Sequence, residues 1–238
     1  MKHGSLFSGI GGFDLAARWA GFTNVWQCEI DPYCQALLKK RFPEVETLYG
    51  DIREVKHPAS VDIISGGFPC QPFSVAGKRR GMEDDRNLWP ELLRIIEIVR
   101  PTWAVCENTY GILSLAAEDV CASLENIGYQ TIPLDIASCA IGLPSVERHI
   151  WFVSTTNSER CERFREGKIS EFKNIPREFQ RKDTGEYRRW DISKPRVCRV
   201  GERIPRRLDR LKSLGNAIVP QVAYAIFEAL AAIEGESQ

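Results

Sequence analysis

Cys70 has the surroundings that a cysteine nucleophile requires. It lies in the run Gly-Gly-Phe-Pro-Cys-Gln-Pro-Phe-Ser at residues 66–74, directly after the β-rich segment 61–65. Pro69 and Pro72 restrict the backbone φ angle and stiffen the chain on both sides of the thiol. An exposed thiolate is a strong nucleophile, whereas a structural cysteine is usually small, buried and inert. We therefore predict that Cys70 is a covalent nucleophile, with a buried core cysteine as the alternative.

Glu107 is the candidate proton donor. It follows the apolar segment Trp103–Cys106 and precedes Asn108, so it should emerge at the same edge of a sheet as Cys70. A carboxyl group at this place could protonate or hydrogen-bond a ring nitrogen while the cysteine attacks the ring. The alternative is a structural role in which Glu107 caps the next helix, because acidic residues favour helix starts.

A glycine-rich turn near the amino terminus predicts a site for a nucleotide-like ligand. Residues 6–14 read Leu-Phe-Ser-Gly-Ile-Gly-Gly-Phe-Asp, which is typical of a strand that passes through a tight turn into a helix. The dinucleotide fingerprint G-x-G-x-x-G is not met, and Asp14 at the helix start would disfavour a pyrophosphate. A merely structural glycine turn is the alternative.

Two acidic residues refine the expected ligand. Glu29 ends the second strand roughly 20 residues after the glycines, where a carboxylate can accept hydrogen bonds from both ribose hydroxyls. Asp51, which follows Tyr49 and Gly50, could contact an adenine amino group. Either acid alone would more often be a solvated loop charge. Together with the glycine turn, they favour an adenosine-containing cofactor without phosphates.

The elements that must position these residues alternate along the chain. Candidate strands end at Phe7, Glu29, Gly66 and Glu107 or cover 129–136 and 150–154, and helical patterns lie near 13–20, 32–41, 87–100 and 112–127. This alternation predicts an α/β fold whose mostly parallel sheet is covered by helices on both faces. After Thr156 we expect a polar recognition region with loops. Apolar residues between 222 and 233 predict a helix, opened by Pro220, that packs back on the sheet.

Composition and charge restrict the class of protein. The 238 residues are 43% hydrophobic and 27% charged, which is typical of one globular domain with a small appendage and excludes disorder. The net charge is zero, but residues 155–215 carry 18 basic against 10 acidic residues and the remainder 14 against 22. The basic segment suits a polyanion.

Cysteine and apolar patterns indicate the compartment. The eight cysteines form no C-x-x-C pair and only three histidines are present, so we expect no metal site. The sequence has no signal segment at its start and no run of 18 apolar residues. We expect a cytoplasmic protein with reduced thiols.

Five segments, in this order, resemble the C5-cytosine-specific DNA methyltransferase family. Residues 7–12 match its cofactor turn, 67–74 its nucleophile loop, and Glu107-Asn108 the start of its ENV motif. Residues 142–144 with Arg148 are similar to a fourth block, and 211–220, which contain Gly-Asn-Ala, resemble the GNAxxP block that completes the cofactor pocket. The resemblance covers residues 4–155 and 196–230.

This resemblance implies a fold and a division into domains. The fold is the Rossmann-like fold of class I S-adenosylmethionine-dependent methyltransferases, with a small target-recognition region. Residues 1–155 would form the catalytic and cofactor-binding domain, 156–210 the target-recognition region, and 211–238 a carboxyl-terminal segment that returns to the catalytic domain.

The resemblance also implies a DNA (cytosine-5-)-methyltransferase mechanism. The target cytosine is flipped out, Cys70 adds to C6, Glu107 engages N3, and C5 takes the methyl group of S-adenosylmethionine. The catalytic set is Cys70, Glu107 and Arg148. The cofactor-binding set is Phe7, Gly9, Gly11, Glu29, Ile30, Asp51, Ile52, Leu88, Asn216 and Ala217. The DNA-binding set is Gln71, Ser74, Lys78, Arg79, Arg160, Arg163 and Arg188, and the loop 74–86 is expected to close over the base.

The chain departs from the family in two blocks. The ENV motif reads Glu107-Asn108-Thr109. Where the family has two arginines one residue apart, this chain has Glu147 and His149, with Arg148 between them. The family's arginines help to hold the cytosine O2 and the catalytic loop. Arg148 could replace them from a neighbouring position, His149 could suffice, or activity could be reduced.

The expected partner is double-stranded DNA. We expect a monomer in the cytoplasm of a bacterium, encoded by the cell or by a phage, with a cognate restriction endonuclease as a further partner. Three alternatives stay open: a catalytically idle DNA-binding relative, a transfer-RNA cytosine-5 methyltransferase, and an NAD-linked oxidoreductase. Residues 155–200 lack the Cys-Phe-Thr signature of the transfer-RNA branch, and the broken fingerprint disfavours NAD.

Overall fold

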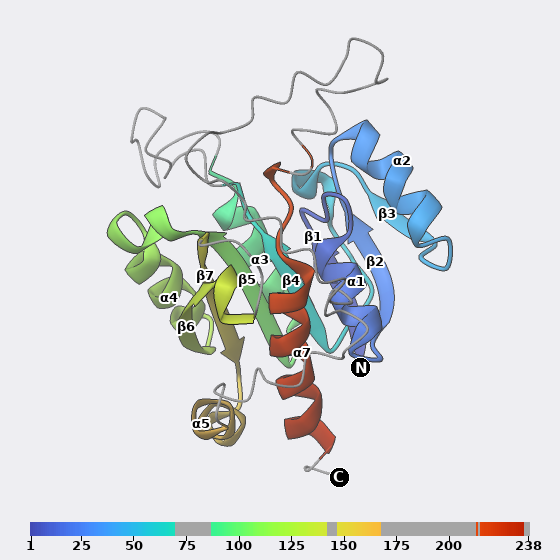
Figure 1. The fold of residues 1–238 in the computed structure, drawn as a ribbon. Helices are drawn as coiled ribbons and strands as arrows, with labels where there is room; N and C mark the ends of the chain where they lie inside the picture. Colours follow the sequence, from blue (N-terminus) through green and yellow to red (C-terminus); the bar gives the residue numbers. More distant parts are fainter. Residues whose placement is uncertain (70–86, 142–146, 168–212, 214, 236–238) are drawn as a thin grey trace, which may run out of the picture.

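The computed structural model describes residues 1–69, 87–141, 147–167, 213 and 215–235. Seven strands form a single sheet in the order β3-β2-β1-β4-β5-β7-β6 (Figure 1). The strands are β1 (Lys2–Leu6), β2 (Thr23–Cys28), β3 (Thr47–Tyr49), β4 (Ile63–Gly67), β5 (Trp103–Thr109), β6 (Gln130–Ala137) and β7 (Arg148–Thr155). Strands β1 to β5 pair in parallel, while β7 runs antiparallel between β5 and β6. The mostly parallel sheet predicted from the alternating pattern is confirmed.

Helices cover both faces of this sheet. They are α1 (Gly12–Trp19), α2 (Pro32–Arg41), α3 (Trp89–Val99), α4 (Ala117–Asn126), α5 (Ser158–Glu166) and α7 (Pro220–Gly235). Short 3-10 turns occupy Ile52–Glu54, Tyr110–Ser114 and Ser138–Ile141. Helices α1 and α7 lie in front of the sheet in Figure 1 and share a core cluster that includes Phe13, Trp151 and Phe227. Helices α3 and α4 pack on the other face, around Leu92, Ile96 and Val120.

The sequence accounts for most of these elements. Four consecutive residues of β5, Trp103–Cys106, are at most 1% exposed, as expected for a central strand with helices on both sides. Helix α2 begins with a proline, and the Asp31 side chain accepts hydrogen bonds from the backbone N–H groups of Tyr33 and Cys34. The predicted helix after Pro220 is confirmed and packs against α1.

The structure corrects the sequence prediction at three places. The region after Thr156 was expected to form loops, but residues 158–166 form helix α5. Asn157 caps it, while only Cys161 and Phe164 are buried, so the apolar periodicity is weak. The helix expected over 112–127 is a 3-10 turn followed by α4, because the backbone of Ala116, with φ −160° and ψ 6°, is not helical. Strand β5 continues to Thr109, so Glu107 lies within the strand and does not cap a helix.

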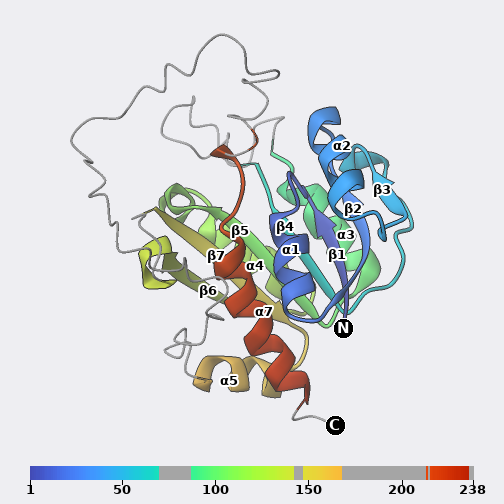
Figure 2. The ribbon, with the colours of Figure 1, turned by 45° about the vertical axis from the view of Figure 1, so that its right-hand side comes forward.

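The antiparallel direction of β7 determines where α5 lies. Thr155, the last residue of β7, pairs with Trp103, the first residue of β5. Helix α5 therefore follows at the amino edge of the parallel strands, near the end of α7 (Figure 2). The cofactor turn follows β1 at the opposite, carboxyl edge. None of the described helices is both long and apolar enough to cross a bilayer.

Candidate active site

The turn after β1 is held in a tight conformation against β2. Phe7, Gly9 and Gly11 have positive φ angles of 52°, 55° and 87°. The backbone N–H of Ser8 donates to the Cys28 carbonyl at 3.0 Å, and the Ser8 hydroxyl donates to the Ser5 carbonyl at 3.1 Å. A phenylalanine with a left-handed backbone conformation is uncommon, and such a conformation persists only where its surroundings enforce it. The turn is therefore a preformed feature of the site.

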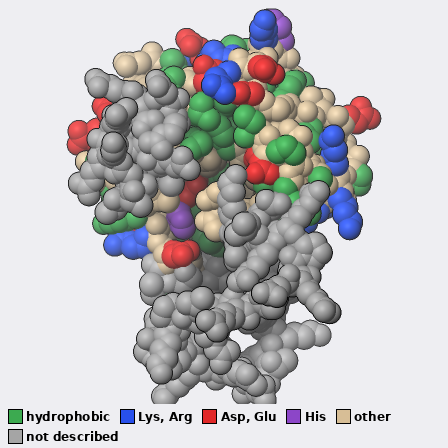
Figure 3. Space-filling view, turned by 90° about the horizontal axis from the view of Figure 1, so that it is seen from above, with side chains coloured by type: hydrophobic (Ala, Val, Ile, Leu, Met, Phe, Trp, Pro, Cys, Tyr) green, Lys and Arg blue, Asp and Glu red, His purple; other side chains and the backbone are tan. Residues whose placement is uncertain are grey.

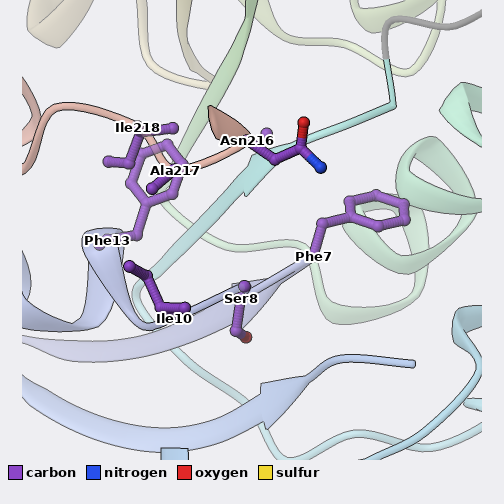
Figure 4. Close-up of a pocket in the computed structure, with 10 residues that line it drawn as sticks. Phe7, Ser8, Ile10, Phe13, Asn216, Ala217 and Ile218 are labelled. Carbon is purple, nitrogen blue, oxygen red and sulfur yellow. The ribbon is translucent and has the colours of Figure 1, made fainter. Parts of the chain in front are cut away.

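A pocket opens between this turn and the segment that returns before α7 (Figure 4). Its lining is uncharged and consists of Phe7, Ser8, Gly9, Ile10, Gly12, Phe13, Gly67, Asn216, Ala217 and Ile218. A Cβ atom on Gly12 would lie 2.7 Å from Cγ1 of Ile218, so a side chain there would clash with the returning segment. Residues from both ends of the chain thus form one pocket, which contains four of the predicted cofactor positions.

Glu29 is fixed directly beside the turn. Its Oε2 accepts a hydrogen bond from the backbone N–H of Gly9 at 2.7 Å, and its Oε1 accepts one from that of Asp31 at 2.7 Å. Each carboxylate oxygen can accept a further hydrogen bond. Ile30 is 62% exposed. The acid and its apolar neighbour are therefore oriented at the carboxyl edge of β2.

The other predicted cofactor residues occupy different surroundings. Asp51 caps the turn Ile52–Glu54 and accepts a hydrogen bond from Nε of Arg53 at 3.0 Å, and this interaction lowers the pKa of Asp51. The Ile52 side chain is buried in the hydrophobic core. Leu88 is half-buried and precedes α3.

Glu107 is a buried acid next to the start of the predicted nucleophile loop. Glu107 as a whole is 8% exposed, and burial raises the pKa of its carboxyl group to about 8. Its Oε2 lies 2.9 Å from the position that a Cβ atom on Gly67 would take. The Asn108 side chain donates to the Phe68 carbonyl at 3.0 Å and so anchors the chain two residues before Cys70. Sequence reasoning missed this anchoring role, although Asn108 belongs to the motif that identified Glu107.

Arg148 and His149 lie on opposite faces of the sheet, because side chains alternate along a strand. Arg148 pairs with Asp135, and its guanidinium lies 4.4 Å from the ring centre of Tyr110. His149 pairs with Thr109 across the β5–β7 ladder, and its Nε2 is 3.8 Å from Oε1 of Glu107. Of the two candidate replacements for the family's arginines, the structure brings His149 to Glu107 and does not bring Arg148 there.

The predicted DNA-binding residues fall into two groups. Arg160 and Arg163 belong to α5 at the amino edge, and the structure does not bring them together with the pocket. Nε of Arg160 donates to Oε1 of Glu234 at 2.6 Å and its Nη2 donates to Oε2 at 3.0 Å. The predicted positions Cys70, Gln71, Ser74, Lys78, Arg79 and Arg188 lie outside the described residues. Among the residues that the structure describes, no group of three or more metal-binding side chains occurs.

The sequence is similar to those of known proteins. A family model for C-5 cytosine-specific DNA methylase matches residues 1–197. Type II methyltransferase M2.BsuMI of Bacillus subtilis (strain 168) is 37% identical over 158 residues, which are 63% of this chain and 40% of that protein. Type II methyltransferase M.AquIA of Picosynechococcus is 37% identical over 121 residues, 46% of this chain and 49% of that protein. The chain thus spans about half or less of the length of these relatives.

Solved structures share the fold. A putative DNA modification methyltransferase encoded within an Escherichia coli prophage has a TM-score of 0.55 and 25% identity, covering 65% of this chain and 46% of that one. Spodoptera frugiperda DNMT2 has a TM-score of 0.55 and 24% identity, covering 66% of this chain and 50% of that one, and supports the fold alone. The predicted Rossmann-like fold of class I S-adenosylmethionine-dependent methyltransferases is confirmed. With the match over residues 1–197, the chain belongs to the C-5 cytosine-specific DNA methylase family.

Proposed function

We propose that this chain is a DNA (cytosine-5-)-methyltransferase that transfers a methyl group from S-adenosylmethionine to C5 of a cytosine in duplex DNA. The observation that carries the proposal is the position of Glu107. A buried carboxyl group with a raised pKa lies next to Gly67, at the start of the loop that contains Cys70. Such a group can hold a proton at neutral pH and offer it to a ring nitrogen.

The pocket suits S-adenosylmethionine better than a phosphate-containing cofactor. Glu29 is held rigidly by the two N–H groups and keeps acceptor capacity for a pair of ribose hydroxyls. The uncharged lining includes the Phe7 ring, which is compatible with a sulfonium cation. A phosphate would lie near the Glu29 carboxylate, which is bound to Gly9 of the turn, and no cationic residue is present in the described lining. When bound, S-adenosylmethionine supplies an electrophilic methyl group.

The chain's own residues would perform the remaining chemistry. The Cys70 thiolate forms a bond to C6 of the flipped cytosine, and Glu107 shares its proton with N3, where negative charge would otherwise develop. This makes C5 nucleophilic towards the methyl group. Solvent water then takes the C5 proton, the C5–C6 double bond forms again, and the bond between Cys70 and C6 breaks to return the thiolate. Asn108 donates a hydrogen bond to the Phe68 carbonyl and so positions the chain just before Cys70.

We propose that residues 1–155 and 211–238 form the catalytic part and that the target is read within residues 156–210, of which 168–210 lie outside the described residues. Helix α5, within the remaining stretch, packs on the catalytic core. We further propose a monomer that acts in the bacterial cytoplasm, with a cognate restriction endonuclease as a further partner.

A covalent trapping experiment tests the reaction. Purified protein is incubated with S-adenosylmethionine and duplex DNA containing 5-fluorocytosine, which blocks loss of the C5 proton, and covalent adducts are separated by denaturing electrophoresis. We expect an adduct with the native protein and none with Cys70→Ala. Transfer of labelled methyl groups to duplex DNA and to transfer RNA is measured in parallel. The absence of both adduct and methyl transfer would indicate a catalytically idle DNA-binding relative.

A further inference from the structure

His149 and Glu107 face each other across neighbouring strands. The imidazole Nε2 lies 3.8 Å from the carboxyl Oε1, and the side chains are 22% and 11% exposed. This separation is too long for a direct hydrogen bond but short enough for either charge to act strongly on the other. Seen from above, a histidine and acidic side chains lie close together on this face (Figure 3).

The other described neighbours of Glu107 carry no charge. From β4 it meets Gly67, and the returning segment contributes Ile218 next to Gly67. On β7 the residue opposite Glu107 is Trp151, whose indole N–H is buried without a described hydrogen-bond partner. Arg148 is on the other face, paired with Asp135. On the side of His149, the nearby acid Glu147 raises the pKa of the imidazole, while burial lowers it more. Within the described residues, His149 is thus the charged or titratable group closest to Glu107.

The residue type at position 149 therefore decides which form of Glu107 is favoured. A permanent cation within about 4 Å stabilises a carboxylate and makes the acid give up its proton more readily. A neutral imidazole exerts no such pull. Burial disfavours the charged form of both partners, since it raises the pKa of Glu107 to about 8 and lowers that of His149. At neutral pH both groups are then uncharged, and Glu107 keeps its proton.

Resting on the methyl transfer proposed above, we propose that His149 is a positioning residue that leaves Glu107 protonated, because its neutral ring takes the place where the family usually has an arginine. The acid can then pass its proton towards N3 as Cys70 adds to C6, and recover it when the ring becomes aromatic again. The active form would be lost at high pH, when Glu107 ionises.

The pH dependence of methyl transfer in two matched variants tests this inference. His149→Arg introduces a permanent cation, whereas His149→Gln keeps a neutral polar side chain. For each protein, the rate at pH 8 is divided by its own rate at pH 6.5, which removes differences in overall activity. We expect His149→Gln to keep the native ratio within about twofold and His149→Arg to lower it about fourfold, as a decrease of about one unit in the acid's pKa from about 8 would produce. Equal ratios in the two variants would overturn the proposal.

A measurement without turnover separates this inference from the proposed function. Carboxyl resonances of glutamate are followed by carbon-13 NMR in the free protein, and Glu107 is assigned by its absence in Glu107→Gln. We expect a titration midpoint well above that of ordinary glutamates in the native protein and a lower midpoint in His149→Arg. An ordinary midpoint in the native protein contradicts the inference even if a variant fails to fold. A protein that shows the expected titration but transfers no methyl group would refute the proposed function instead.

Discussion

Glu234 at the amino edge of the sheet and Glu107 at the carboxyl edge have opposite surroundings. At the amino edge, Oε1 of Glu234 on α7 accepts hydrogen bonds from Arg160 of α5 at 2.6 Å and from the Trp103 indole of β5 at 3.0 Å. The carboxylate of Glu234 is thus paired with a guanidinium, and these contacts connect α7, α5 and β5. At the carboxyl edge, Glu107 is buried without a described cation beside it. Phe7 holds a left-handed conformation, and Ile30 is 62% exposed.

This contrast distinguishes polar residues that stabilise the fold from residues of the same types that serve the site. The groups at the amino edge satisfy one another, which strengthens the packing of α5 and α7 on the sheet. Those at the carboxyl edge carry burial and conformational costs that the fold itself does not require. Such costs are expected where a ligand or substrate completes the site. Substitutions at the carboxyl edge should therefore affect activity, and those at the amino edge should affect stability.

The sharpest test of the contrast is Glu107→Gln. The amide has nearly the same shape but cannot transfer a proton to a ring nitrogen. We expect methyl transfer to fall by roughly 10²- to 10⁴-fold, the usual contribution of general acid–base catalysis. Single-turnover transfer of a labelled methyl group to duplex DNA measures it, with circular dichroism as the control for folding. A loss below about threefold would remove Glu107 from the catalytic set.

The pH dependence of stability examines the cost of burying the same acid. Its pKa rises from an ordinary value of 4.5 to about 8 on folding, so between these values the folded chain binds more protons than the unfolded chain. The stability contribution of Glu107 is complete below pH 4.5 and is lost as the pH rises towards 8. As the pH rises from 4.5 to 8, the free energy of unfolding of the native protein should therefore fall relative to that of Glu107→Gln, by up to about 1.4 kcal/mol per pH unit. Urea unfolding at several pH values measures the difference, and a constant difference would contradict the prediction.

Gly67→Ala tests whether the space beside Glu107 matters. The added Cβ atom would lie 2.9 Å from the Glu107 Oε2 and would displace the carboxyl group. We expect about a 10- to 100-fold loss of methyl transfer, because small misplacements of catalytic groups are costly. Gly50→Ala is the matched control, since a Cβ atom there meets nothing within 4 Å. Similar activity in both variants would show that Glu107 tolerates displacement.

Much of the carboxyl edge could be predicted from the sequence. Buried parallel strands are apolar runs, as in Trp103–Cys106, and chemically distinctive residues follow or end them. Parallel topology then brings Phe7, Glu29 and Glu107 to the same edge without any knowledge of side-chain contacts. The family resemblance added the returning segment, which periodicity alone would not have placed beside the turn.

The parts that could not be predicted depend on register and on long-range pairing. The pairing of His149 with Thr109 determines that His149, and not Arg148, lies on the same face of the sheet as Glu107. A shift of the β5–β7 register by one residue would place Arg148 on that face instead. Helix α5 was missed because only Cys161 and Phe164 mark its buried face. The partner of Arg160 is 74 residues away in the sequence, so local composition indicated a DNA contact rather than an ion pair.

Arg160→Ala tests the amino edge and has the smallest expected effect. The variant loses both hydrogen bonds to Glu234, which keeps its bond to Trp103, in a pair whose side chains are 30% and 22% exposed. We expect the free energy of unfolding to fall by about 1 kcal/mol, since partial exposure weakens an ion pair. Arg165→Ala on the exposed side of the same helix is the control and should change it by less than about 0.5 kcal/mol.

The same variant decides between stabilisation and DNA binding by Arg160. An arginine that contacts phosphate contributes about 0.9 to the slope of log affinity against log salt concentration. If Arg160 only holds α5 to α7, the slope for duplex DNA should match that of the native protein, because α5 lies at the edge opposite the pocket. A slope reduced by about one, without a change in stability, would mean that Arg160 leaves Glu234 to bind DNA. The amino edge would then belong to the recognition surface, and the contrast between the two edges would fail.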